Sequence, residues 1–255
     1  MIRLATLRSL LLILALATVA AAQTSLNYGF VSPNTKENLK LDDAIAGMNS
    51  AEETQLVRKS INLGCVVRTQ IRAYKALGSW SDGAEPSVML RFASDEPTVR
   101  YLMSRLGRDA RQKSILYFHP QPAGDADLYT LQPRRPVRNL KALANTLERA
   151  GIAFRTIVPL KSGTRIYVVD LKRDLRDEVM AAAKTLRARV RSQRGKAAFV
   201  GDDQAQQAQP VYDQEIRDYE VKNPNLPPTC DRQPQRVPDP KRKKAQATQR
   251  TSETN

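Results

Sequence analysis

The chain has 255 residues, with 41 lysines and arginines against 26 aspartates and glutamates, for a formal net charge of +15. One histidine and two cysteines offer no metal-ligand spacing of a known kind, which excludes a zinc module built on those residues. No phosphate-binding loop or nucleophile-elbow motif occurs, so we predict no cofactor. The excess of basic residues indicates anionic partners.

The first 22 residues have the layout of a signal peptide. Arg3 and Arg8 precede an apolar stretch, and Ala20 and Ala22 form a small-x-small cleavage site before Gln23. The uncharged run after Arg8 is shorter than the roughly twenty residues that a membrane-spanning helix needs, so a retained anchor is the less favoured alternative. We therefore predict an exported protein, periplasmic or extracellular, with no transmembrane span after cleavage.

Composition divides the remaining chain into an amino-terminal extension over 23–49, a basic domain over 50–196 and a tail over 197–255. The tail has nine acidic and nine basic residues, so the net charge belongs to the part before it. Because the tail is rich in proline and glutamine and poor in large apolar residues, it is predicted to be mostly disordered. No internal repeat is evident in the sequence.

One segment of the tail departs from this pattern. Tyr212, Ile216 and Tyr219 recur at helical spacing and share one face over residues 211–221. This segment is predicted as a helix that docks on the domain.

The elements of the domain follow from caps, turns and periodicity. A first helix is predicted from Ser50, which forms a capping box with Glu53, to about Gly78. The next elements, in chain order, are a strand over 87–92, a helix from Asp95 to 106, strands over 114–119 and 127–132, a helix over 137–150, strands over 153–158 and 165–170, and a long basic helix over 172–193.

From residue 87 the order is strand, helix, strand, strand, helix, strand and one extra strand. This order predicts the α+β class and a ferredoxin-like βαββαβ antiparallel sheet, in which strand 127–132 pairs back on strand 114–119. The added amino-terminal helix, the long basic carboxy-terminal helix and the disordered tail complete the predicted architecture. The ferredoxin-like fold hosts many unrelated functions, so it carries no functional weight by itself.

His119 ends a predicted strand and is the only histidine. A catalytic imidazole needs a second group within hydrogen-bond reach, and Asp82 and Glu85 in the loop before residue 87 are the weak candidates. The ordinary interpretation is a polar strand edge.

The loop over 78–85 contains Trp80, the only tryptophan, among several groups that can bond a ligand. Functional residues concentrate on loops, so Trp80 is a candidate binding residue. The alternative is a tryptophan that covers the core beside ordinary turn residues.

The strongest charge feature is a basic cluster without an acid. A solvated helix face is the favoured interpretation, followed by binding of an envelope polyanion. Nucleic acid is disfavoured, because no aromatic stacking set lies beside the cluster and an exported protein rarely meets nucleic acid. The cluster consists of Lys184, Arg187, Arg189, Arg191, Arg194 and Lys196.

Cys65 and Cys230 are the only cysteines and permit a single intramolecular disulfide. Export would place them where disulfides persist, whereas a buried free thiol at Cys65 is the alternative. The function predicted from these observations is that of an exported, non-enzymatic protein that binds a protein partner or an anionic envelope component. The alternative is a hydrolase-like enzyme that uses His119 with Asp82 or Glu85.

Overall fold

The structure is a computed structural model that describes residues 26–33, 39–80, 83–171, 174–201, 208–227 and 230, with only the backbone at position 80. The leader predicted over 1–22 and most of the predicted disordered tail lie outside these residues.

Eight strands of the described residues form one closed antiparallel barrel in the order β1-β3-β2-β6-β7-β5-β8-β4. The strands are β1 Asn27–Val31, β2 Arg72–Trp80, β3 Gly83–Phe92, β4 Ser114–Pro120, β5 Ala126–Pro133, β6 Arg155–Val158, β7 Arg165–Leu171 and β8 Ala188–Gly201. The helices are α2 Leu41–Gly47, α3 Ala51–Val66, α4 Glu96–Ala110, α5 Leu140–Arg149, α6 Arg176–Thr185 and α7 Ala208–Lys222.

The barrel consists of two halves with the same connectivity. Strands β1 to β4 lie in the order β4-β1-β3-β2, and strands β5 to β8 lie in the order β8-β5-β7-β6. The pairs β4–β8 and β2–β6 join the halves and close the barrel. A structural repeat is therefore present where the sequence shows none.

The predicted ferredoxin-like open sheet is wrong, because the barrel is closed and its strands are grouped differently. The unit predicted from residue 87 starts at β3 and runs across both halves. Strand β5, over the predicted 127–132, pairs with β7 and β8 rather than with β4.

The first predicted helix is correct at its start and wrong at its end. The Ser50 hydroxyl accepts a hydrogen bond from the Glu53 amide at 3.1 Å, as the capping box predicts. The helix ends at Val66, and Arg68 takes a left-handed backbone with φ of 56°. Strand β2 then begins at Arg72, and Ile71 and Tyr74, which would share a helical face, belong to different core clusters because side chains alternate along an extended chain.

The long basic helix predicted over 172–193 is also wrong. Helix α6 stops at Thr185, Arg187 turns the chain with φ of 47°, and the 14-residue strand β8 follows. Strand β8 pairs with β5 along its first part and with β4 along its second. These ladder hydrogen bonds on two sides outweigh the high helix propensities of Arg, Ala and Lys.

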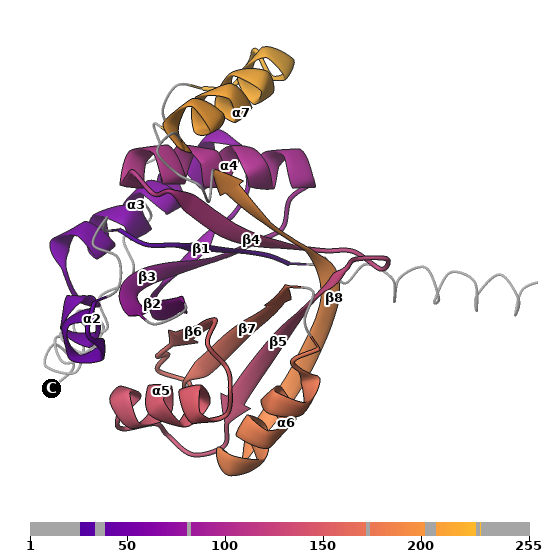
Figure 1. Cartoon of the computed structure of the whole chain (residues 1–255). Coiled ribbons are helices and arrows are strands. Elements are labelled where there is room, and N and C mark those ends of the chain that lie inside the picture. The colour runs from indigo at the N-terminus through magenta and orange to yellow at the C-terminus, as the bar shows by residue number, and fades with distance from the viewer. Residues whose placement is uncertain are drawn as a thin grey trace, which may run out of the picture.

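The core has three parts that follow from the alternation of side chains along each strand. An inner cluster, which includes Phe30, Met89 and Phe118, fills the barrel. One outer cluster packs the first half against α3 and α4, and another packs the second half against α5 and α6. Figure 1 shows these helices on the outside, with α7 beyond α4.

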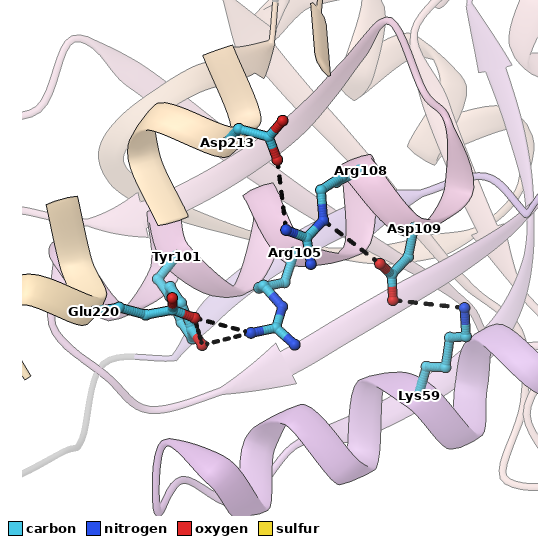
Figure 2. Close-up of polar contacts among 7 residues, drawn as sticks. All are labelled: Lys59, Tyr101, Arg105, Arg108, Asp109, Asp213 and Glu220. Carbon is cyan, nitrogen blue, oxygen red and sulfur yellow. Dashed lines mark hydrogen bonds and ion pairs between the residues drawn. The ribbon is translucent and has the colours of Figure 1, made fainter. Parts of the chain in front are cut away.

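Helix α7 contains the segment 211–221 and docks on α4. The buried Tyr212 hydroxyl donates a hydrogen bond to the Val200 carbonyl at 3.1 Å. Polar contacts surround this anchor, among them Arg105 with Glu220 at 3.1 Å and Arg108 with Asp213 at 3.5 Å, as Figure 2 shows.

Candidate functional site

The structure does not bring His119 and Glu85 together. The His119 Nδ1 atom lies 2.6 Å from Oδ1 of Asn27, which pairs with Phe92 at the far end of β3 from Glu85. The seven residue steps from Glu85 to Phe92 span about 24 Å in a strand. Asp82 lies outside the described residues. His119 is a hydrogen-bonded polar residue near the end of β4, opposite Lys196 of β8.

Trp80 is the last residue of β2, and its side chain lies outside what the structure describes. Its backbone pairs with Gly83 across the turn between β2 and β3.

The predicted basic cluster is divided by the structure. Lys184 lies in the last turn of α6 and Arg187 in the turn after it. Arg194 donates to the Gly124 carbonyl at 2.8 Å, and Lys196 pairs with Glu96 at 2.6 Å. Of the six cations, only Arg189 and Arg191 line the cavity described next.

Arg189 and Arg191 line a cavity of about 610 Å³ that adjoins the inner core cluster. Side chains from β1, β3, β5, β7 and β8 surround it, and none of the described lining residues is acidic. We call it the basic cavity because four arginines are among the residues that line it. The arginines and tyrosines of its lining are Tyr28, Arg91, Arg165, Tyr167, Arg189 and Arg191.

Strand pairing explains why residues distant in sequence meet here. Thr130 of β5 is opposite Tyr167 on one side and Arg191 on the other. On the first half of the barrel, Tyr28 of β1 is opposite Arg91 of β3. In β8 the alternation places both arginines toward the cavity and the intervening Val190 against the outer cluster.

Two tyrosines form part of the inner side of the cavity. The rings of Tyr28 and Tyr167 have centroids 5.6 Å apart, and Tyr167 is 3% exposed. Burial raises the pKa of Tyr28, as does Tyr167, whereas Arg91 and Arg165 lower it. Because the net effect raises the pKa, the Tyr28 hydroxyl keeps its proton at neutral pH and can donate a hydrogen bond.

Among the described residues, no hydrogen bond or ion pair engages the side chains of the four arginines of the basic cavity, Arg91, Arg165, Arg189 and Arg191. Arginine presents a planar fork of donors that matches the oxygens of carboxylate and phosphate groups. The arrangement can therefore bind an oxyanion by several forks at once, with a tyrosine hydroxyl as a further donor.

Sequence reasoning singled out Arg189 and Arg191 and missed Tyr28, Arg91 and Arg165. A weak signal was present, because Arg91 alternates with Leu90 and Phe92 and so belongs to the opposite face of its strand. Nothing local shows that this face meets β7 and β8.

Cys65 of α3 and Cys230 are paired, with Cα atoms 5.9 Å apart. This separation lies within the usual range for a disulfide. In the part of the chain that the structure describes, no cluster of three metal-ligating side chains is found. No helix there has the length and apolar content to cross a membrane.

No protein-family model matches the chain, and no curated protein matches it. Two solved structures are weakly similar. A candidate monooxygenase from Lactobacillus acidophilus has 6% identity and a TM-score of 0.23, covering 69% of this chain and 95% of its own. A candidate monooxygenase from Fusobacterium nucleatum has 11% identity and a TM-score of 0.22, covering 68% and 92%. At these scores neither likeness bears on the function of this chain.

Proposed function

We propose that this chain is an exported, non-enzymatic protein that binds an anionic component of the cell envelope through the basic cavity. The observation that carries the proposal is the convergence of four arginines, none engaged by another described side chain, on one cavity without an acidic lining residue. Four like charges at one site repel one another, so an arriving oxyanion relieves that repulsion as well as forming new bonds.

Two observations support export. The leader over 1–22 has a short apolar region and a small-x-small site. The paired cysteines are compatible with an oxidising compartment.

The walls of the cavity favour binding of a charged group. Leu128 and Tyr167 belong to the inner core cluster and Tyr28 packs against it, so the cavity borders the apolar core. Charge-assisted hydrogen bonds are stronger beside low-dielectric walls than in open water. We therefore place the anionic group between the four arginines of the basic cavity and the Tyr28 hydroxyl.

Calorimetric titration with tripolyphosphate, a small multivalent oxyanion, tests the proposal. The double variant R165Q/R191Q removes two cations from the cavity and should weaken binding about a hundredfold, since each charged contact contributes about 1.5 kcal/mol. The matched control is R58Q/R176Q, which removes two exposed arginines from α3 and α6.

Equal losses in the two variants would assign binding to overall net charge and reject the basic cavity as the site. Failure of the unmodified chain to bind either tripolyphosphate or vesicles rich in anionic lipid would reject the function itself.

A further inference from the structure

A second cavity of about 510 Å³ adjoins the basic cavity. We call it the outer cavity. Its lining comes from the end of β5 and the segment that follows, residues 132–137, from the turn between β6 and β7, residues 160–164, and from Arg189 of β8. Gln132 and Arg189 line both cavities, so the two cavities are neighbours that share part of one wall.

The outer cavity has the same charge character as the basic cavity. Arg134, Arg135 and Lys161 line it, and none of the described lining residues is acidic. Among the described residues, the side chains of these three cations form neither a hydrogen bond nor an ion pair with another residue. Seven cations therefore follow the two cavities, with Arg189 at the junction.

The backbone around the outer cavity is held in place. Pro133 at the end of β5 and Pro136 after it restrict the backbone here, and Pro133 pairs with Ala188 of β8. Gly163 closes the opposite turn with φ of 115°, and its amide donates to the Leu160 carbonyl at 3.0 Å. The outer cavity is therefore formed without a ligand, which reduces the entropic cost of binding.

Each cavity is within the roughly 300–1,000 Å³ range that accommodates a whole small ligand, so a single oxyanion would occupy a minor part of the pair. A row of cations along two neighbouring cavities suits anionic groups that recur along one chain. Two aromatic residues line these cavities, the half-buried Tyr28 and the buried Tyr167, so a series of exposed aromatic faces on which successive nucleic-acid bases could stack is not part of this row.

We propose that the ligand is a linear polyanion that extends from the basic cavity across Arg189 into the outer cavity. This inference rests on the proposed function of the basic cavity and specifies its ligand. The shared chemistry is an unbranched chain with a phosphate or carboxylate on each unit. The outer cavity therefore supplies affinity only for chains longer than the basic cavity can contain.

The test is a length series of two probes, linear polyphosphate and oligogalacturonate, titrated into the purified chain. The variant R134Q/R135Q/K161Q leaves every cation of the basic cavity in place. It should bind tripolyphosphate as the unmodified chain does, and bind chains of fifteen or more units about tenfold more weakly. Its matched control, K40Q/R58Q/R176Q, removes two arginines and one lysine that are exposed elsewhere.

Salt dependence provides a second readout that a general loss of stability would not imitate. Each neutralised group on a single-stranded polyanion contributes about 0.7 to the slope of log affinity against log salt. The triple variant should lower that slope by about 2 for long chains and leave it unchanged for tripolyphosphate. Length-dependent binding of either probe supports the inference, and the probe that binds identifies the phosphate or carboxylate source.

Two results would overturn it. If tripolyphosphate binds but longer chains gain nothing from the outer cavity, the extended ligand is wrong and the function of the basic cavity stands. If single-stranded DNA of matched charge binds more tightly through the same seven cations, the partner is a nucleic acid. Absence of binding by every probe would instead reject the proposed function.

Discussion

Glu53 shows how one residue can serve two local roles. Its amide caps onto Ser50, while its fully buried carboxylate has Oε2 3.4 Å from the Lys75 ammonium. Burial raises the pKa of Glu53 to about 7, and the opposing effect of Lys75 does not offset it. The folded protein therefore binds this proton more tightly than the unfolded chain does.

This shift predicts a pH dependence of stability. Because the folded pKa lies above the ordinary value of 4.5, the contribution is present below pH 4.5 and lost as pH rises to about 7. The free energy of unfolding should fall by about 3 kcal/mol over that window. Urea denaturation at pH 5 and pH 8 should show a smaller difference in the free energy of unfolding for Glu53→Gln than for the unmodified chain. The control is Glu52→Gln, a substitution at the exposed neighbouring residue. A pH dependence that persists in Glu53→Gln but is lost in Glu52→Gln contradicts the assignment to Glu53.

Arg191 and Arg194 provide a second test at the residue scale. They lie three positions apart on β8, so their side chains leave opposite faces, Arg191 into the basic cavity and Arg194 toward the Gly124 carbonyl. Arg191→Gln should weaken tripolyphosphate binding about tenfold in calorimetry, whereas Arg194→Gln should not. A larger loss in Arg194→Gln would restore the undivided basic surface expected from the sequence.

At the scale of elements, α7 is attached by burial more than by charge. Tyr212 is fully buried against Gly107 of α4, where an added Cβ would lie 2.5 Å from its ring. The rings of Tyr101 and Tyr219 stack at 4.3 Å. The surrounding ion pairs are partly exposed, and such pairs contribute at most about 1 kcal/mol each.

Two substitutions separate these contributions. Tyr212→Ala removes a buried aromatic ring and should lower the free energy of unfolding by about 3–5 kcal/mol. Asp213→Asn removes the pair with Arg108 and should cost less than about 1 kcal/mol. Urea denaturation measures the costs, and hydrogen exchange shows whether α7 loses protection first. Equal losses of unfolding free energy in the two variants would contradict the larger contribution that we assign to burial.

At the scale of the whole molecule, closure depends on contacts between residues far apart in the chain. The barrel closes through β2–β6 and β4–β8, and the pair Cys65–Cys230 joins α3 to the region after α7. The two cysteines are separated by 165 residues, so the bond encloses most of the barrel sequence.

The disulfide should stabilise the fold mainly by restricting the unfolded chain. A loop of this length corresponds to about 5 kcal/mol in the chain-entropy model. Reducing agent should lower the urea midpoint of the unmodified chain and leave that of Cys65→Ser/Cys230→Ser unchanged. Intact mass after alkylation without reduction is the direct check, because two alkylated thiols in the monomer would show that the bond does not form.

Export makes its own prediction. Cleavage after Ala22 leaves three residues, Gln23, Thr24 and Ser25, before Leu26, which lines the basic cavity. Amino-terminal sequencing of the exported protein should begin at or within a few residues of Gln23. A mature product that retains Met1 would contradict the leader and, with it, the placement in the envelope.

The sequence by itself determined the features that depend on near neighbours. Ser50 and Asp95 cap helices because a short side chain reaches an amide three residues on, whatever the rest of the chain does. The hairpin between β6 and β7 likewise follows from a local turn, and the candidate cysteine pair from a count of two.

Only the tertiary structure decided which segments became β2 and β8, how the sheet closed and where the arginines met. Apolar residues from Ile71 to Leu77 and the run Arg189-Val190-Arg191 suit either a helix or a strand by local preference. Pairing with partners on two sides selected the strand. Strand β3 is close to β2 in the chain, but the second partner of β2 and both partners of β8 lie tens of residues away. The basic cavity exists because closure brings β1 and β3 against β7 and β8, a long-range juxtaposition that no local pattern encodes.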